Sequence, residues 1–273
     1  MFLITGCNGQ LGTCLSKLLP DAICTDRDTL DITDVDAVKK FVVENNIDTI
    51  INCSAYTAVD CAEDDIETAT RVNTDGPRNL AQTGARIIHI STDYVFDGKS
   101  NRPYTPENQP NPMSVYGKTK LDGENEIVKN SDVFVIIRTS WLYSVYGNNF
   151  VKTMRRLGAD RPELNVVCDQ IGTPTLADDL ARAIVKIIPQ MTRENSGVYH
   201  FSNLGVCSWY DFATKIMELS NLPCSVKPIL SADYPTRATR PFYSVLDKDK
   251  ITKTFNIENR YWETALRACL SEF

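Results

Sequence analysis

Short apolar runs alternate with segments of helical spacing through the first half of the chain. Five of these runs have the length and β-branched content of buried strands, namely FLIT, AICT, TIINCS, RIIHIS and VFVIIR. The segments between them, among them GQLGTCLSKLL and DVDAVKKFVVEN, repeat apolar residues at helical spacing. This alternation predicts βαβ units, and the right-handed crossover rule favours an α/β fold with a doubly wound parallel sheet of the Rossmann type.

The pattern changes at about residue 150 to shorter mixed elements such as NNFVKTMRRLG and SWYDFATKIMELS. We expect a dinucleotide-binding domain over residues 1–150 and a smaller C-terminal α+β substrate-binding region over 151–273. That boundary is approximate and segments can interleave across it, because no linker marks it. GVYHFSN and SWYDFA are predicted to be a strand and a helix of the smaller region, with His200 packed rather than catalytic. Residues 100–114, which hold four prolines, are predicted to form a long loop.

Charge and cysteine content limit the partners and the compartment. A net charge of −6 with scattered basic residues predicts no nucleic-acid partner. The apolar runs fall well short of the ~18 residues of a membrane span, and no signal peptide precedes the first strand, so we expect a cytoplasmic protein without a membrane partner. The nine cysteines never form Cys-x-x-Cys and are expected to be reduced and packed.

The segment ITGCNGQLG places Gly6, Gly9 and Gly12 three residues apart, between the first strand and the first helix. Glycines there allow a sharp turn and a close approach to a pyrophosphate, which the helix N-terminus binds. The spacing is G-x-x-G-x-x-G, unlike the G-x-G-x-x-G of most dehydrogenases. A tight turn without a ligand explains it as well.

The end of the second strand, CTDRDTLDITD, leaves the cofactor open. Asp26 can accept hydrogen bonds from an adenosine ribose, which favours NADH, whereas Arg27 can meet a 2′-phosphate, which favours NADPH. Asp31 and Ile32 can lie against the adenine. Alternatively, Asp31 or Asp34 is an N-cap of the next helix.

A hydroxyl pair and a Tyr-x-x-x-Lys pair are the catalytic candidates. Ser91 and Thr92 stand at the end of the fourth strand, where ligands of open parallel sheets bind. Tyr116 and Lys120 share one helical face, and a nearby ammonium brings the phenol pKa toward neutral pH. Thr92 would then bind a carbonyl, Tyr116 deliver a proton, and Lys120 assist Tyr116 and hold the cofactor. Alone, the pair is also common by chance.

In combination, these motifs resemble the extended branch of the short-chain dehydrogenase/reductase superfamily. The closest resemblance is to the dTDP-4-dehydrorhamnose reductase family, and it includes GCNGQLG, INCSAYTAVDCAE, ISTDYVFDG, NPMSVYGKTKLDGE, DQIGTPT and TRATRPFYSVLD. It covers nearly the whole chain. The resemblance implies reduction, by NADPH or NADH, of the C4 ketone of a nucleotide-linked 6-deoxy sugar. The expected reaction converts dTDP-4-dehydro-L-rhamnose to dTDP-L-rhamnose, for cell-wall polysaccharide.

The resemblance also assigns residues at the matching positions. The cofactor positions are Gly9, Gln10 and Leu11 at the pyrophosphate, Asp31 and Ile32 at the adenosine, and Ser54, Ala55 and Tyr56 after the third strand. The substrate positions are Thr92, Asp93 and Trp141, and the acid with its partner are Tyr116 and Lys120. Without the resemblance, Trp141 is interpreted as a core aromatic.

Some positions depart from the family or stay open. The family more often has alanines and a histidine where Cys53, Ser54 and Tyr56 stand, which bears on cofactor preference. Some members hold Mg²⁺ at a homodimer interface where Asp178 stands, although a lone surface aspartate is the alternative. Arg240 can meet the substrate diphosphate or simply order an Arg-Pro turn.

Three other functions compete with the reductase. Sugar-nucleotide dehydratases place Asp-Glu after the threonine, and Tyr94 at the second position disfavours that activity. A sugar-nucleotide epimerase shares the Tyr/Lys pair and is less firmly excluded. A non-catalytic nucleotide-binding regulatory subunit would have no need of Thr92, Tyr116 and Lys120 together.

Overall fold

The computed structural model describes residues 1–273 and is built on a six-stranded parallel sheet in the order β10-β5-β4-β3-β1-β2. The strands are β1 (Phe2–Thr5), β2 (Ile23–Thr25), β3 (Thr49–Asn52), β4 (Arg86–Thr92), β5 (Phe134–Thr139) and β10 (Gly197–His200). The five predicted strands and the Rossmann-type sheet are confirmed. The strand order reverses between β1 and β3, and ligands of such sheets bind beyond the carboxyl ends at this point.

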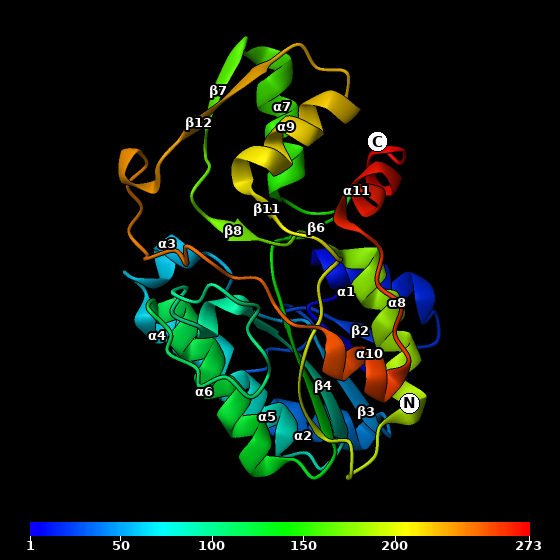
Figure 1. The fold of residues 1–273 in the computed structure, drawn as a ribbon. Helices are drawn as coiled ribbons and strands as arrows, with labels where there is room; N and C mark the ends of the chain where they lie inside the picture. Colours follow the sequence, from blue (N-terminus) through cyan, green and yellow to red (C-terminus); the bar gives the residue numbers. More distant parts are fainter.

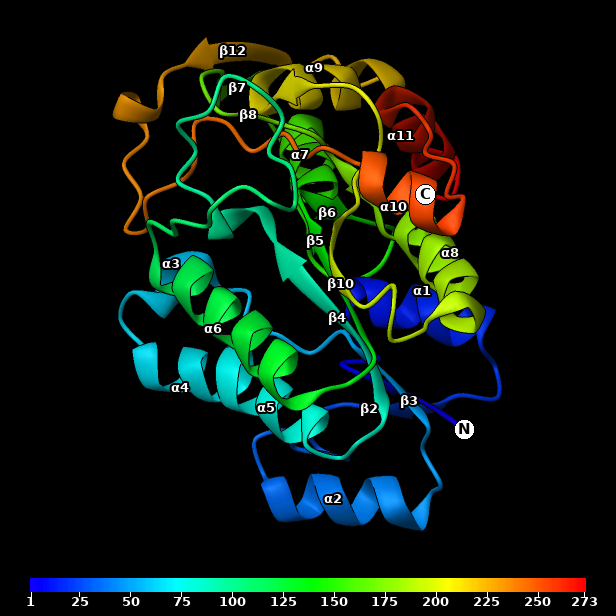
Figure 2. The ribbon, with the colours of Figure 1, turned by 60° about the horizontal axis from the view of Figure 1, so that its bottom comes forward.

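Helices cover both faces of the sheet (Figures 1 and 2). One layer contains α1 (Gln10–Leu18), α8 (Ala177–Ile187) and α10 (Asp249–Phe255). The other contains α2 (Val35–Glu44), α4 (Ile66–Thr70), α5 (Gly76–Ala81) and α6 (Val115–Asn130), with a π turn, η1 (Arg71–Asp75), joining α4 to α5 and the short α3 (Val59–Ala62) nearby. Because both faces are buried, the strands are apolar throughout rather than alternating.

A smaller lobe lies above the carboxyl ends of the sheet strands (Figure 1). Its helices are α7 (Phe150–Asp160), α9 (Trp209–Leu219) and α11 (Trp262–Leu270). Its strand pairs are β7 (Glu163–Val167) with β12 (Ser225–Ile229), β6 (Leu142–Tyr143) with β9 (Thr175–Leu176), and β8 (Ile171–Gly172) with β11 (Cys207–Ser208). The remaining elements, which are distributed over both parts, are three short 3₁₀ turns: η2 (Asp93–Val95), η3 (Ile188–Gln190) and η4 (Ser231–Asp233). Sixteen buried residues form a separate core for this lobe.

The chain crosses between the two parts several times. GVYHFSN forms a strand as predicted, but its assignment to the smaller region is wrong, because β10 pairs with β5 at the edge of the large sheet. Its side chains Tyr199 and Phe201 are buried in the core under α8, so the sheet edge is where this strand buries its apolar residues. The elements α8, β10 and α10 follow residue 150 and nevertheless pack on the large domain, so segments interleave across the predicted boundary. The position of that boundary stays a prediction.

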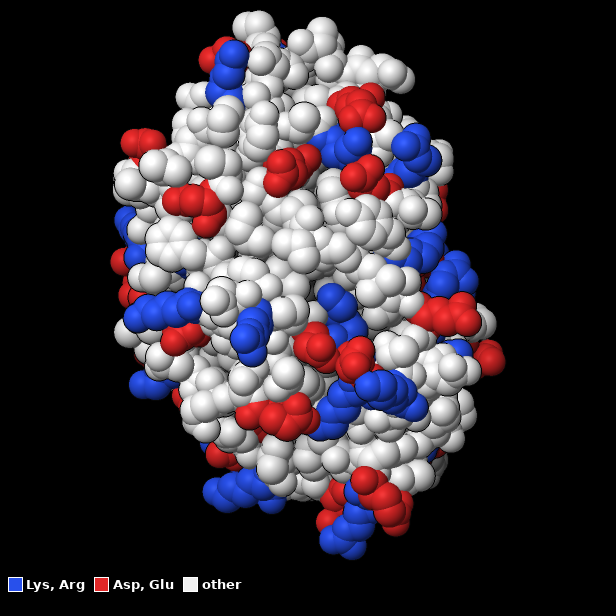
Figure 3. Space-filling model, viewed as in Figure 1, with Lys and Arg blue, Asp and Glu red and all other residues white.

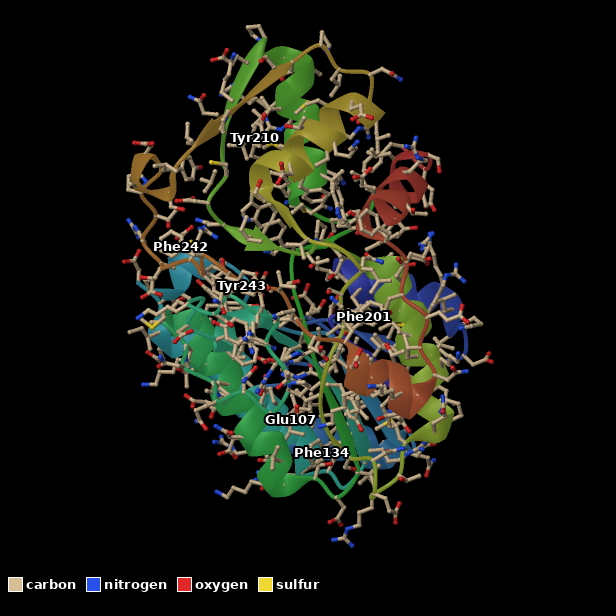
Figure 4. The ribbon with its side chains drawn as sticks, in the orientation of Figure 1. Glu107, Phe134, Phe201, Tyr210, Phe242 and Tyr243 are labelled. Atoms are coloured by element: carbon tan, nitrogen blue, oxygen red, sulfur yellow. The ribbon has the colours of Figure 1, made fainter.

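The segment 234–247 connects the smaller lobe to α10 on the large domain, and Figure 4 labels Phe242 and Tyr243 on it. The Phe242 carbonyl accepts from the Ile171 N–H at 2.8 Å, and the Tyr243 N–H donates to the Gly98 carbonyl at 3.1 Å. Acidic and basic side chains alternate over the face in Figure 3 without a large field of one sign. No helix is long and apolar enough to span a membrane.

Candidate active site

The glycine turn sits at the reversal of strand order, between the ends of β1 and β3. Gly6 has φ +66°, and a Cβ there would lie 2.8 Å from the Ser54 nitrogen, so no other residue fits without moving the backbone. Gly9 is the N-cap of α1, and no side chain caps the helix. The first N–H groups of α1 are thus available to an anion, and their dipole favours negative charge.

A cavity of about 380 Å³ opens on one side of this turn. It is lined by Gly6 and Gly9, by Arg27, Asp31 and Ile32 from the loop after β2, by Ser54, Ala55 and Tyr56 after β3, and by Arg71 from η1. The N-cap of α2 is Asp34, which accepts from the N–H groups of Asp36 and Ala37. Asp31 is therefore not that cap, and it remains beside the cavity.

Asp26 and Arg27, which follow β2, have different contacts. Asp26 closes its own loop: its carboxylate accepts from the N–H groups of Asp28 and Thr29, at 3.1 Å each, and from the Asn8 amide. Hydrogen bonds, led by the Thr29 hydroxyl, hold the pKa of Asp26 below its usual range. Arg27 lines the cavity instead, together with Arg71, whose Nη2 donates to the Thr33 hydroxyl at 3.2 Å. Sequence inspection missed Arg71.

A second cavity, of about 600 Å³, continues from the other side of the turn. The two cavities share Gly6, Gly9, Cys53 and Ala55, so together they run along the carboxyl edge of the sheet from β2 to β5. The second is also lined by predicted residues from four further segments: Gln10, Leu11, Gly12, Thr92, Asp93, Tyr116, Lys120 and Trp141. The structure thus brings the predicted catalytic and cofactor residues to one elongated site, Asp26 excepted.

Thr92, Asp93 and Tyr116 form the polar centre of the second cavity. The Thr92 hydroxyl donates to Asp93 Oδ1 at 3.0 Å, whereas Asp93 Oδ2 is buried without a partner. Burial raises the pKa of Asp93 to about 6. Burial also raises the pKa of the Tyr116 phenol, and its hydrogen bond with Thr92 acts in the opposite direction. Tyr116 therefore stays protonated at neutral pH, as a proton donor must. The expectation that the Lys120 ammonium brings the pKa of this phenol toward neutral pH is wrong for the free protein, because burial dominates.

Lys120 is fully buried, with an exposed fraction of 1%. Its Nζ donates to the Ile90 carbonyl at 2.6 Å and lies 3.2 Å from Nε2 of His89. Burial lowers the pKa of Lys120 to about 8, although Glu124 and Cys53 act in the opposite direction. His89 was not singled out from the sequence as a site residue, although its ring nitrogen lies within hydrogen-bonding distance of this lysine.

Helix α6 holds Tyr116 and Lys120 in place. Its N-cap Ser114 accepts from the Gly117 N–H at 3.1 Å. A Cβ on Gly117 would lie 2.2 Å from the Tyr94 carbonyl oxygen, so glycine lets the first turn approach the loop after β4. One turn beyond Lys120, Glu124 forms a buried two-pronged pair with Arg138 of β5, at 2.6 and 2.9 Å.

Two tryptophans line the far end of the cavity. Trp141 has φ +49° and stacks on Trp209, with 3.6 Å between ring centroids and 11° between ring planes. The sequence indicated Trp141 only through the family resemblance, and Trp209 was interpreted merely as the start of a helix. Stacked aromatic faces of this kind suit the apolar face of a sugar or a base.

Two further predicted residues lie outside these cavities. Arg240 donates to Asp60 at 2.6 Å and to the Tyr94 hydroxyl at 3.2 Å, and Tyr94 itself lines the second cavity. Asp178 lies at the start of α8, where it pairs with Arg182 at 2.8 Å. No group of three or more His, Cys, Asp or Glu side chains gathers there or elsewhere, and the neighbouring Asp179 is bound by Arg260 and Asn203. These residues do not fit Mg²⁺, which prefers several oxygen ligands, so the expected metal site is not supported.

Comparisons with known proteins place the whole chain in one group. The sequence model described as "RmlD substrate binding domain" matches residues 1–273. A dTDP-4-dehydrorhamnose reductase of Aggregatibacter actinomycetemcomitans is 42% identical, over 97% of this chain and 96% of that protein.

Two solved structures are similar over their full length. One is a dTDP-4-dehydrorhamnose reductase from Clostridium acetobutylicum, with a TM-score of 0.96 and 45% identity over 99% of this chain and 98% of that one. The other is the dTDP-4-dehydrorhamnose reductase of Bacillus anthracis in complex with NADP, with a TM-score of 0.95 and 40% identity over 100% and 99% of the two chains.

Proposed function

We propose that this protein, which belongs to the RmlD substrate binding domain family, reduces the C4 ketone of dTDP-4-dehydro-L-rhamnose to give dTDP-L-rhamnose. The observation that carries this proposal is the continuous site along the sheet edge. One cavity has two arginines for a nucleotide, and the next has Thr92, Tyr116 and Lys120 below a pair of tryptophans. The names of the similar reductases supply the substrate class.

The chemistry is a hydride addition followed by protonation. The nicotinamide cofactor, when bound, supplies the hydride that adds to C4. As the carbonyl electron pair moves onto oxygen, the Thr92 hydroxyl stabilises the developing alkoxide by a hydrogen bond. The Tyr116 hydroxyl gives its proton to that oxygen, which leaves a phenolate on Tyr116.

Lys120 acts on the phenolate rather than on the sugar. It lies one helical turn from Tyr116 and lines the same cavity, so its positive charge stabilises the phenolate electrostatically. Asp93 supports substrate binding, because it lines the same cavity and its carboxyl oxygens can accept from a sugar hydroxyl. The Trp141–Trp209 stack forms an apolar wall against which the sugar ring can pack.

We infer that NADPH is the preferred cofactor. Asp26 would bind a ribose 2′-hydroxyl, but its carboxylate is already occupied by its own loop. Arg27 and Arg71 both line the adenosine cavity, and guanidinium groups suit a 2′-phosphate. The NADP complex of the Bacillus anthracis relative supports the same preference.

Arg240 is proposed to bind the substrate diphosphate, because a guanidinium fork suits phosphate geometry. Its guanidinium is engaged by Asp60 and Tyr94, so binding a diphosphate requires an exchange of partners. We also propose a cytoplasmic location, which the nine free cysteines support because thiols stay reduced there. A homodimer stays a prediction, and sedimentation of the purified protein would decide it.

The test is an assay of the purified protein with dTDP-4-dehydro-L-rhamnose. We expect NADPH oxidation faster than NADH oxidation and a dTDP-L-rhamnose product by NMR. The Thr92→Ala variant should keep NADPH binding and lose turnover. An epimerase would instead show bound oxidised cofactor and no net oxidation. A regulatory subunit would bind nucleotide without turnover, and either result would contradict the proposal.

A further inference from the structure

A row of buried polar side chains runs across the sheet behind Lys120. Thr5, Asn52 and His89 are register partners on β1, β3 and β4, and their exposed fractions are 1%, 1% and 0%. The Thr5 hydroxyl donates to Asn52 Oδ1 at 2.7 Å, and Asn52 Nδ2 lies 3.0 Å from His89 Nδ1. Nε2 of His89 then meets Lys120 Nζ at 3.2 Å. The proposed mechanism leaves this row without a task.

The hydrogen-bond partners determine which nitrogen of His89 carries the proton. The Ser54 N–H can only donate, and it lies 3.1 Å from Asn52 Oδ1, so the amide oxygen faces Ser54 and the amide nitrogen faces His89. Asn52 Nδ2 therefore donates to Nδ1 of the imidazole. A neutral imidazole then carries its single proton on Nε2, which is directed at Lys120.

An Nε2–H group that points at Nζ favours the uncharged amine form of Lys120. A free amine has a lone pair that accepts this hydrogen bond while its own N–H donates to the Ile90 carbonyl. An ammonium would place two donors against each other. We propose that the Asn52–His89 pair is a positioning device that holds Lys120 Nζ and stabilises its uncharged form.

The other influences on Lys120 either lower or raise its pKa. Burial acts in the same direction as His89 and lowers the pKa of the lysine. Glu124 from α6 and Cys53 after β3 act in the opposite direction, and Glu124 is largely neutralised by Arg138 from β5. The pair thus sets the pH at which Lys120 acquires the charge that stabilises a Tyr116 phenolate. The inference deepens the proposed function and rests on it for this consequence, although not for the hydrogen bonds.

The tautomer can be measured without any substrate. The chain has only two histidines, so ¹⁵N NMR of histidine-labelled protein gives two sets of ring signals, and the His200→Gln variant assigns them. We expect His89 to be neutral at pH 7, with its proton on Nε2. A proton on Nδ1, or a charged imidazolium, would overturn the inference.

The charge of Lys120 is measured by the titration of its ¹³Cε signal, which the Lys120→Met variant identifies. We expect a midpoint near 8 in the wild-type protein. His89→Gln offers an amide oxygen to an ammonium, so the midpoint should rise by about one pH unit, the equivalent of one hydrogen bond. Asn52→Asp replaces the N–H donor that faces Nδ1 with an acceptor oxygen, so it should raise the Lys120 midpoint as well. His200→Gln is the matched control and should leave it unchanged.

The pH dependence of turnover connects the device to the reaction. kcat should fall as the pH rises through the Lys120 midpoint, and the fall should move upward in His89→Gln by the same amount. An unchanged midpoint in both His89→Gln and Asn52→Asp would contradict the inference. If the NMR results hold and no nucleotide-linked ketosugar is reduced, the proposed function fails while the positioning role of His89 stands.

Discussion

Tyr116 is the residue on which the proposed reduction depends most. Its phenol lines the cavity, contacts Thr92 and has a raised pKa, so it is protonated and ready to donate near neutral pH. Tyr94 packs edge-on against it, with 5.5 Å between ring centroids, and fixes the plane of the ring. These features distinguish it from a tyrosine that merely fills space on a helix.

We predict that Tyr116→Phe lowers kcat by about 10²- to 10⁴-fold, the usual contribution of a positioned general acid. Binding of NADPH, followed by fluorescence titration, should change little because the ring remains. Tyr199→Phe is the matched control, since its hydroxyl donates to the Asn195 carbonyl far from the site. Turnover of Tyr116→Phe at the wild-type rate would rule out this acid.

At the adenosine end, Arg27 is expected to discriminate between the two cofactors. Arg27→Ala should raise the KM for NADPH about tenfold, the effect of losing one charge-assisted hydrogen bond of ~1.5 kcal/mol. The KM for NADH should stay within about twofold, since NADH lacks the 2′-phosphate. Steady-state kinetics with both cofactors measure this, and equal effects on the two would contradict the assignment.

Helix α6 and strand β5 are joined by the buried Glu124–Arg138 pair, and this pair positions the catalytic helix. Both side chains are almost completely inaccessible, and Ser91 also donates to Glu124. Arg138 stacks over Phe96 as well, 5.1 Å from the ring centroid. Removing one partner leaves a buried charge without compensation, which costs far more than the pair contributes as a whole.

We therefore predict that Glu124→Leu destabilises the protein by about 3–5 kcal/mol in urea denaturation. The double variant Glu124→Leu/Arg138→Met should recover most of this loss. Glu44→Ala breaks the exposed pair with Lys40 on α2 and should cost less than about 0.5 kcal/mol. A loss in Glu124→Leu as small as that of Glu44→Ala would show that the buried pair does not anchor α6.

The sequence predicted which segments form strands better than it predicted which strands pair with one another. The five strands were predictable because strands buried on both faces are continuously apolar. The four residues of GVYH carry no information on which sheet they join, and β10 was therefore misplaced. Asn52 and His89 interrupt two of the apolar runs, TIINCS and RIIHIS, and this polar interruption was the available signal of the row behind Lys120. Trp209 and Arg71 gave no comparable signal, since the π turn and the lobe packing place them.

The whole molecule combines a large domain, built on the six-stranded sheet, with a smaller lobe, and the candidate site lies where the two meet. The proposed cofactor residues come from the sheet edge, whereas Trp209 comes from the lobe, so the second cavity exists only when both are assembled. Both histidines are buried in the large domain, and burial lowers their pKa values, that of His200 to about 3. Stability of the assembled chain is consequently linked to pH.

We predict a loss of stability in mild acid that His200 accounts for in part. Below pH ~6.5, the histidine is protonated in the unfolded chain but stays neutral in the folded one, so the unfolded state binds more protons. Its contribution is complete above pH ~6.5 and is lost as the pH falls toward 3, by about 1.4 kcal/mol per pH unit. Asp93, whose pKa is raised to about 6, opposes this loss between pH ~3.8 and 6.

The comparison of His200→Gln with the wild-type protein isolates this effect. Unfolding free energies at pH 5 and pH 7 should differ less in the variant, by up to about 2 kcal/mol. An identical pH dependence in the two proteins would mean that His200 has the same pKa in the folded protein as in the unfolded chain, which would contradict the prediction.

One measurement tests the proposed reduction most directly. The protein is incubated with dTDP-4-dehydro-L-rhamnose and NADPH that carries deuterium at the transferable position of the nicotinamide, and the product is examined by NMR. We predict dTDP-L-rhamnose with deuterium at C4 of the sugar, in an amount equal to the NADPH oxidised. Unchanged ketosugar, or oxidation of NADPH without deuterium at C4, would contradict it.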